Sequence, residues 1–264
     1  MSVPGVSGGT MAILLGIYDR LISAISNFFK DVKRNLLFLI QFCIGAFLGI
    51  GTLAFVISWL LDTFPIPVSF FFLGAVVGGI PALYKKTKTT TIKVSSVLYM
   101  ITGFIIVISI GFIPELNVNV SGGVSLSNLL LWLITGIIVA IALVLPGIST
   151  SHMLIVLGMY DVTLNAIKSF DLLFLAILAF SVLIGIIITT KPLEWTMNQY
   201  PHQTYCMIIG FVVGSTLEIV NDIIIPSISS NTNILWWIVI IIISIITFAL
   251  GNYGIVYLSR YAQD

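Results

Sequence analysis

The sequence predicts an all-α integral membrane protein made of two inverted-topology repeats, with broken or re-entrant helix hairpins that carry Pro-Gly-x-Ser loops. Three observations predict it: the composition, an internal repeat, and the distribution of lysine and arginine. Of the 264 residues, 59% are hydrophobic and 8% are charged, whereas a soluble domain has about 25% charged residues. So few charges cannot solvate a water-facing surface. The net charge of +1 gives no reason to expect nucleic acid as a partner.

Nine apolar stretches account for most of the chain, and short polar or proline-containing loops separate them. Most approach the roughly 20 residues that span the hydrocarbon core of a bilayer. The stretches are 10–28, 36–61, 66–84, 94–113, 127–145, 147–167, 172–190, 204–225 and 234–258. Their polar residues are mostly Gly, Ser and Thr, which membrane helices tolerate where they pack closely. We therefore expect one helical membrane domain over residues 1–264.

An internal repeat starts at two Pro-Gly motifs. PGVSGGTMAILLGIYD, from Pro4 to Asp19, aligns with PGISTSHMLIVLGMYD, from Pro146 to Asp161, at an offset of 142. Nine of the sixteen aligned positions are identical. Self-similarity at a fixed spacing is the sequence signature of a repeated structural unit.

The similarity resumes further along both halves at an offset of 136. Its most specific matches are Gly49 with Gly185, Trp59 with Trp195, Pro65 with Pro201, Gly74 with Gly210 and Gly78 with Gly214. Chance matches are common among leucines, but Trp, Pro and Gly rarely coincide together. We expect repeat one over 1–114 and repeat two over 127–260.

Basic residues predict the orientation of the spans. If three spans separate the two motifs, ten of the eleven Lys and Arg residues fall on one side: Arg20, Lys30, Lys33, Arg34, Lys85, Lys86, Lys88, Lys93, Lys191 and Arg260. Cytoplasmic loops carry the excess of Lys and Arg, so this side is expected to be cytoplasmic. The C-terminus would then face the cytoplasm. Because three is odd, the second copy is inverted relative to the first.

The segments 127–145 and 147–167 form either two full spans or a re-entrant hairpin. Charge counting cannot separate these alternatives, because both return to the same side. The turn at Pro146 favours a re-entrant tip at mid-depth, where irregular backbone is tolerated if protein surrounds it. A continuous helix from Pro146 to Asp161 would rise about 22 Å, enough to reach the surface from the midplane. The first copy has only three residues before Pro4, so either the recorded start is short or one hairpin arm is absent.

The two loop tips provide the candidate substrate-binding residues, which are Ser7, Gly8, Gly9, Thr10, Ser149, Thr150, Ser151 and His152. Each tip follows a Pro-Gly break and opens a helix, where free backbone N–H groups and the positive end of the helix dipole favour an anion. Glycines permit close approach, hydroxyls add neutral donors, and His152 adds a titratable group. The competing interpretation is that these residues only cap and break membrane helices. Two tips from inverted repeats favour a site, because transporters bind substrate between repeats at broken helices.

Other polar residues flank the tips and spans. Arg20 is a candidate for attracting a phosphate from the cytoplasmic side, although the charge bias of its loop explains it equally well. The coupling or gating candidates are Asp19, Asp161, Tyr18, Tyr160 and Glu218. Solvated helix ends and interfacial anchoring are the alternatives for the first four. A carboxyl within an apolar span, as at Glu218, costs free energy, which makes it a candidate for accepting a coupling proton.

The segment PGVSGGTMAILLGIYDRLI, from Pro4 to Ile22, resembles the signature of the bacterial polyprenyl-phosphate transporter family. The resemblance covers essentially the whole chain. It implies a flippase that returns undecaprenyl phosphate from the outer to the cytoplasmic leaflet, for reuse in peptidoglycan and other cell-wall polymers. The implied partners are this lipid phosphate, membrane lipids and a coupling proton or cation. The second motif departs from the first, with Thr-Ser-His in place of Gly-Gly-Thr.

Two other classes of function compete with this one. Membrane phosphatases that act on undecaprenyl pyrophosphate carry similar loops, but this chain has no arginine between Arg34 and Arg260 and no paired glutamate near the tips. Phosphoryl transfer without a cationic clamp is hard to stabilise, so we expect no enzyme. A channel or transporter for a small soluble anion is the third class. A lateral gap for a lipid tail would favour the lipid, and a closed aqueous vestibule the small anion.

The sequence contains no metal-binding or cofactor motif, and its two cysteines lack ligand spacing, so we expect no cofactor and no metal. Whether the unit forms a homodimer is open. The small-residue faces at Gly45 and Gly49, and at Gly74 and Gly78, are typical of close helix packing either within one chain or between two.

Overall fold

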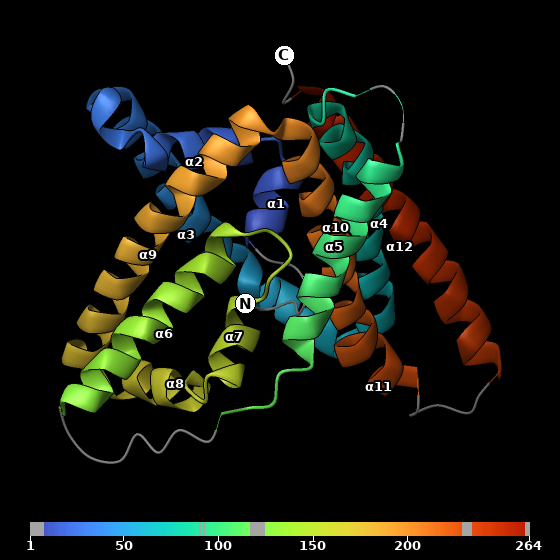
Figure 1. Ribbon diagram of the computed structural model, residues 1–264. Helices are drawn as coiled ribbons and strands as arrows, with labels where there is room; N and C mark the ends of the chain where they lie inside the picture. The colour runs from blue at the N-terminus through green and yellow to red at the C-terminus, as the bar shows by residue number, and fades with distance from the viewer. Residues whose placement is uncertain (1–7, 90, 92, 117–124, 229–233, 262–264) are drawn as a thin grey trace.

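A computed structural model describes residues 8–89, 91, 93–116, 125–228 and 234–261, and all regular elements in these ranges are helical (Figure 1). Seven helical segments in this part of the chain are long and apolar enough to cross a membrane. They are α3 (Val32–Thr63), α4 (Pro65–Lys86), α5 (Val94–Gly111), α6 (Leu126–Val144), α9 (Leu172–Gln199), α10 (Pro201–Ile219) with its continuation, and α12 (Ile234–Tyr261). The predicted class, an all-α multi-pass membrane protein, is confirmed.

Shorter helices complete the architecture. A first arm consists of α1 (Gly8–Leu14) and α2 (Tyr18–Ser26), and η1 (Phe28–Lys30) connects it to α3. A second arm consists of α7 (Thr150–Val156) and α8 (Tyr160–Ser169). The π-helical turn η2 (Val220–Ile224) and α11 (Ile225–Ile228) continue α10. The short helices α1 and α7 are equal in length, and their first residues, Gly8 and Thr150, are aligned in the internal repeat.

Both arms break at a glycine. Gly16 and Gly158 have φ angles of 74° and 64°, and the backbone hydrogen bonds of each break follow the Schellman pattern that ends many helices. In the first arm, the N–H groups of Gly16 and Ile17 donate to Ile13 and Ala12 at 2.9 and 3.0 Å. The bend between α1 and α2 is 117°. The expectation of a continuous helix from Pro146 to Asp161 was therefore wrong, because a left-handed glycine ends α7 after two turns.

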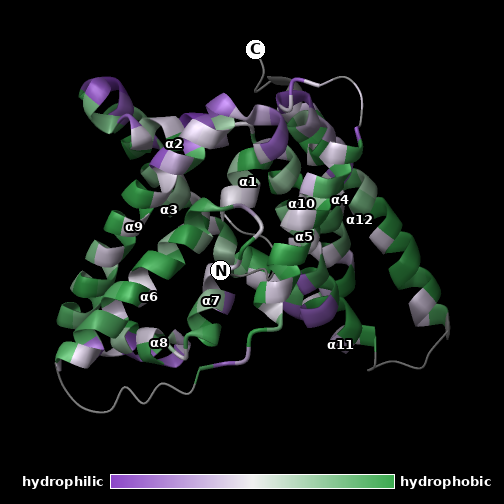
Figure 2. Cartoon of the chain, viewed as in Figure 1, coloured by the Kyte–Doolittle hydropathy of each residue, from purple (hydrophilic) through white to green (hydrophobic). Residues whose placement is uncertain are grey.

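The two arms point to opposite ends of the molecule. α1 runs from the middle toward the end that carries α2, whereas α7 runs from the middle toward the end that carries α8 (Figure 1). Hydrophobic residues dominate the long helices between these ends, and hydrophilic residues gather mainly near both ends (Figure 2). We refer below to the end with α2 as the upper end.

The last long helix of each half, α5 or α12, packs against the other half. α4 packs along α12, and α10 packs along α5. A Cβ added at any of four glycines in these crossings would overlap the facing helix backbone: Gly74 with Phe248, Gly251 with Phe71, Gly210 with Met100, and Gly103 with Met207. The pairs correspond between halves, since the offset of 136 that aligns Gly74 with Gly210 also aligns Phe71 with Met207. The glycines therefore allow two equivalent close crossings.

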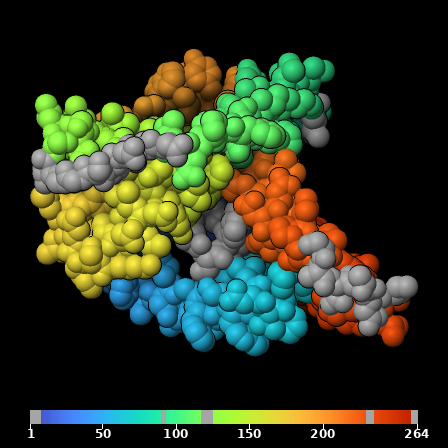
Figure 3. All heavy atoms as spheres, turned by 90° about the horizontal axis from the view of Figure 1, so that it is seen from below, coloured from blue at the N-terminus to red at the C-terminus, as the bar shows by residue number. Residues whose placement is uncertain are grey.

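α3 lies apart from this packed group. Its only buried residue is Asn35, and it contacts the rest of the chain mainly through α2, η1 and α4. A Cβ at Gly45 or Gly49 would meet nothing within 4 Å among the described residues, whereas Gly74 and Gly78 pack against α12. Packing within the chain thus explains the small residues at Gly74 and Gly78, but not those at Gly45 and Gly49. Seen from below, α3 and α4 form one side of the molecule (Figure 3).

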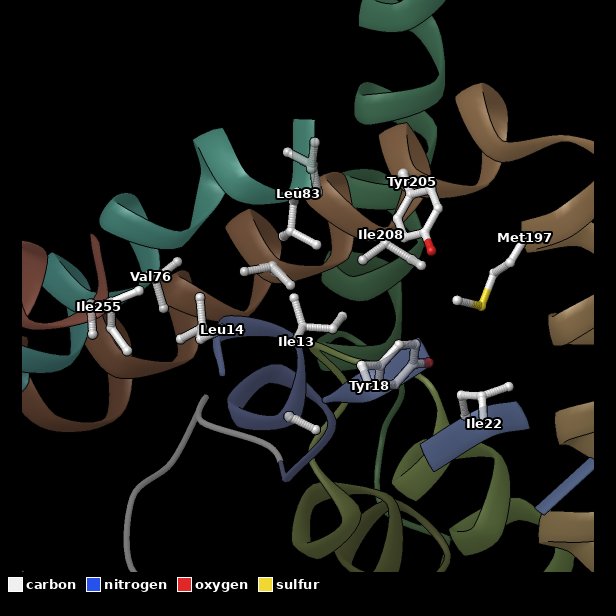
Figure 4. Close-up of a cluster of buried hydrophobic side chains, with 14 of the residues drawn as sticks. Ile13, Leu14, Tyr18, Ile22, Val76, Leu83, Met197, Tyr205, Ile208 and Ile255 are labelled. Atoms are coloured by element: carbon white, nitrogen blue, oxygen red, sulfur yellow. The ribbon is translucent and has the colours of Figure 1, made fainter. Parts of the chain in front are cut away.

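The main buried cluster surrounds the first arm. Ile13, Leu14 and Tyr18 of this arm pack among residues of α4, α9, α10 and α12, including Val76 and Ile208 (Figure 4). The Gly79 site is one reason for the fit, because a Cβ there would overlap the Leu14 side chain. The first arm is consequently held in the interior of the bundle.

Candidate binding site where the two loops meet

The tips of the two arms touch each other. The Gly147 N–H donates to the Thr10 Oγ1 at 3.0 Å, and the Thr10 side chain is fully buried. A Cβ at Gly9 would lie 3.2 Å from the Pro146 Cα. Gly147 has a φ of 80° and lies against the Phe211 backbone, so no other residue fits there without strain. Segments from the two halves of the sequence therefore meet in the middle of the bundle.

The second tip presents a row of polar groups. Ser149 caps α7 by accepting a hydrogen bond from the His152 N–H at 3.3 Å. Ser149, Thr150, Ser151 and His152 are all partly exposed. Backbone N–H groups in the first turn of a helix lack acceptors within the helix, and the Nε2 atom of His152 is buried with no hydrogen-bond partner among the described residues. This tip therefore brings hydroxyls, backbone N–H groups and an imidazole close together.

The first tip has fewer polar side chains than the second among the described residues. Gly8 is exposed, and Gly9 and Thr10 are buried in the contact with the second tip. Ser7 lies outside the described residues. Of the eight predicted tip residues, the structure thus places seven, on two tips that come together at one location.

The break in the first arm is tied to the bundle by polar contacts. The Tyr18 hydroxyl donates to the Val144 carbonyl at 2.7 Å, at the end of α6. The Asp19 carboxylate forms an ion pair with Lys86 at 2.7 Å, and the Lys86 Nζ lies 5.9 Å from the centre of the Tyr205 ring. The other carboxylate oxygen of Asp19 is buried without a hydrogen-bond partner in the described part of the chain. These contacts join α2, α4, α6 and α10 just above the tips.

Lys86 did not stand out in the sequence. It lies in a lysine-rich stretch at the end of an apolar span, where the positive-inside tendency and a favourable interaction with the helix C-terminus both account for it. Its partner is 67 residues away. Only the tertiary structure could reveal the pair.

The break in the second arm lacks this arrangement. Tyr160 is 40% exposed and Asp161 is exposed, while Met159 is buried beside Trp132 and Phe174. At the repeat offset of 136, Lys86 corresponds to Asp222, which cannot form an ion pair with Asp161. The two arms share a backbone shape but not an electrostatic environment.

The remaining candidates lie away from the tips. Arg20 is on the upper side of the first break, with its guanidinium 5.2 Å from the centre of the Phe38 ring. The seven residues of α1, which rise about 10 Å, separate it from the first tip. Glu218 is partly buried in the last turn of α10, directly before the π-helical turn. Within the described ranges, no group of three or more His, Cys, Asp or Glu residues could hold a metal ion.

Two broken arms whose tips meet inside a bundle of apolar helices define the class of multi-pass membrane transporters, in which substrate sites form at broken helices. Comparison with known proteins identifies the family. The chain belongs to the family of undecaprenyl phosphate translocase-like proteins, whose profile matches residues 1–233.

Two curated relatives are similar over most of their length. A polyprenyl-phosphate transporter of Vibrio cholerae is 33% identical over 231 residues, which cover 82% of this chain and 72% of the relative. A polyprenyl-phosphate transporter of Staphylococcus aureus is 35% identical over 259 residues, which cover 93% and 88%. No solved structure matches. The family resemblance predicted from the sequence is confirmed, and the names of the family and its relatives indicate a transporter rather than an enzyme.

Proposed function

We propose that this protein is a flippase that returns undecaprenyl phosphate from the outer to the cytoplasmic leaflet of the bacterial cytoplasmic membrane, and so supports cell-wall polymer synthesis. The observation that carries the proposal is the meeting of the two polar tips inside the bundle. It occurs in a chain whose relatives are named polyprenyl-phosphate transporters.

The chemistry of the tips fits a lipid phosphate. A phosphate cannot cross hydrocarbon unaided, because its charge would be stranded without water. The hydroxyls of Ser149, Thr150 and Ser151, together with free N–H groups of the same turn, would replace that water as donors. His152 would add a further donor, and the glycines of the first tip would let the phosphate approach the backbone. α1 and α7 are short, so we assign the binding to these local donors rather than to long helix dipoles.

The isolated position of α3 supports a lipid substrate over a small soluble anion. A lipid phosphate needs a lateral opening, so that its headgroup enters the bundle while its chain stays in the membrane. α3 contacts the chain mainly near its two ends, through α2 and η1 and through α4. The long exposed stretch between these contacts leaves room for the chain of the lipid.

The upper end is proposed to face the cytoplasm. It carries the first arm break, the end of α4, Lys191 near the end of α9, and the end of α12. These segments and the turns beside them hold ten of the eleven basic residues, which is the expected bias for cytoplasmic loops. The C-terminus would then be cytoplasmic. The matched helix breaks and crossings of the two halves support the assignment of inverted repeats over 1–114 and 127–260.

The contrast between the arms supports an outward-facing state. The first tip is mostly buried and its break is closed by the Asp19–Lys86 pair on the upper side, whereas residues 149–152 of the second tip are partly exposed. We propose that a proton or cation couples to the cycle by loosening the Asp19 pair. Tyr18, which precedes Asp19 in the chain, would move with it when the pair loosens. Tyr160, Asp161 and Glu218 would take part in coupling or gating on the outer side.

Leaflet-resolved measurement of undecaprenyl phosphate in proteoliposomes tests the proposal. The intact protein should move the lipid between leaflets, and Ser149→Ala and His152→Ala should each slow this movement. Thr102→Ala is the matched control, because the Thr102 hydroxyl is exposed on α5 and bonds only its own helix at Leu98, 2.8 Å away. Movement of inorganic phosphate instead of the lipid would support the small-anion alternative, and release of phosphate from undecaprenyl pyrophosphate would contradict the transporter.

A further inference from the structure

An apolar groove lies at the upper end of the molecule, outside the tips. Its volume is about 840 Å³, within the range of pockets that bind small ligands. The end of α2, η1, α3 and α9 line it. Most of the lining is hydrophobic, including Leu39 and Cys43 of α3 and Leu183 and Ile187 of α9.

Among the described residues, two lysines line the groove, Lys30 on η1 and Lys191 on α9. Both are exposed, and neither lies within ion-pair distance of a carboxylate among the described residues. The neighbouring carboxylates form hydrogen bonds to other groups and not to these lysines. Asn27 donates to both carboxylate oxygens of Glu194, at 2.6 and 2.7 Å, and Asp31 accepts the Arg34 N–H at the start of α3. The groove therefore combines an apolar wall with two lysines that pair with no carboxylate among the described residues.

The groove has the shape of a site for one lipid with an anionic headgroup. From Lys191 to Leu183, α9 descends about 12 Å toward the middle of the membrane. A phosphate at the lysines would thus have its hydrocarbon chain beside Leu183, Ile187 and Leu39, in the direction that a lipid chain takes in the bilayer. Lysines at the membrane surface attract anionic headgroups.

The other half of the molecule has no equivalent cation pair. At the repeat offset of 136, Lys191 corresponds to Phe55, so the pair is not repeated in the first half. A binding site present at only one end would serve only one leaflet. The groove is also directly connected to the first arm, because α2 runs from the Asp19 break to Ser26 and Asn27 in the groove wall.

From these observations we infer that the groove is a second substrate site, which holds the polyprenyl phosphate in the cytoplasmic leaflet after it has left the loop tips. Lys30 and Lys191 bind the phosphate, and the wall between α3 and α9 holds the first part of the chain. This inference rests on the proposed function, because it uses the same substrate and the same orientation.

The exposed thiol of Cys43 provides a direct test, since Cys206, the other cysteine, is buried. The purified full-length protein in lipid nanodiscs is treated with N-ethylmaleimide, and alkylation of each cysteine is followed by mass spectrometry. Undecaprenyl phosphate should slow alkylation of Cys43. Undecaprenol, which lacks the charge, and phosphatidylglycerol, which has two chains, should slow it much less.

The double variant Lys30→Gln/Lys191→Gln should lose this protection, with affinity for undecaprenyl phosphate about fivefold weaker for each lysine removed. Lys85→Gln is the matched control, because it removes the same charge from an exposed position at the same end, outside the groove. Ile187→Trp should fill the groove and also remove the protection. Thermal unfolding of each variant verifies that it is folded.

The outcomes separate this inference from the proposed function. Equal protection by phosphatidylglycerol or undecaprenol would overturn the inference, because the groove would then be a general lipid-facing surface. Absence of protection in a protein that still moves undecaprenyl phosphate between leaflets would overturn the inference and leave the function in place. Protection without any movement between leaflets would support the site and contradict the flippase.

Discussion

The two arms have one local structure and two different environments. Both have a seven-residue helix, a left-handed glycine, a Schellman break, and then a Tyr-Asp pair that starts the next helix. In the first arm Tyr18 is 1% exposed and Asp19 is paired with Lys86. In the second arm Tyr160 is 40% exposed and Asp161 has no lysine at the equivalent position.

This difference separates the residues that determine the backbone shape of a repeated motif from those that determine the environment of its side chains. The shared residues determine the backbone, because helix caps and glycine conformations are local effects. The residues around the motif, which are not shared, determine whether an identical Tyr-Asp pair is buried and paired or exposed at the protein surface. An asymmetric transport cycle can therefore arise from two arms of the same shape.

A substitution at the contact between the two arms should have the largest effect on the protein. Gly147→Ala places a methyl group against the Phe211 backbone at a residue with a φ of 80°. We expect severe loss of folded protein, since the facing atoms are backbone and cannot move aside easily. The measurement is the yield of monodisperse protein after purification. Gly45→Ala is the control, because nothing lies within 4 Å of its Cβ, and normal behaviour of Gly147→Ala would contradict the observed contact.

The Tyr-Asp pairs should differ in their effect on transport. Asp19→Asn removes the charge that binds Lys86, so we expect about a tenfold slower movement of undecaprenyl phosphate. Asp161→Asn should slow the movement less, because Asp161 is exposed and forms no ion pair among the described residues. A cycle of Asp19→Asn, Lys86→Gln and the double variant should give a coupling of about 1 kcal/mol in unfolding free energy, since both side chains are partly exposed. Equal transport losses for both aspartates would remove the proposed asymmetry.

Replacing the glycine at either helix break, in contrast, should destabilise the protein to a similar extent. Gly16→Ala and Gly158→Ala each force a residue with a Cβ into the left-handed conformation, at a cost of about 1–2 kcal/mol. Chemical or thermal unfolding of the two variants should therefore give similar losses of stability. A large difference would mean that the surrounding helices, and not the shared motif, determine the shape of the breaks.

Much of this architecture could be predicted from the sequence, but the contacts between distant segments could not. The long spans and the two repeat offsets follow from patterns within the chain. Gly16 and Gly158 were visible in the aligned motifs, but the continuous apolar run around them concealed the helix breaks. The Asp19–Lys86 pair, the exchange of α5 and α12 between halves, and the groove with Lys30 and Lys191 depend on tertiary packing. No local pattern encodes such contacts.

The smallest expected difference concerns the tyrosine hydroxyls. Tyr18→Phe removes the buried hydrogen bond to the Val144 carbonyl, at 2.7 Å, and should lower the unfolding free energy by about 1 kcal/mol. Tyr160→Phe should lower it by much less, because Tyr160 is 40% exposed and its hydroxyl forms no hydrogen bond among the described residues. Paired thermal unfolding curves of the two variants in one detergent measure the difference. If both variants unfold at the same temperature as the unmodified protein, the Tyr18 hydroxyl does not hold the first arm to α6, and the rigidity of that arm must come from apolar packing around Ile13 and Leu14.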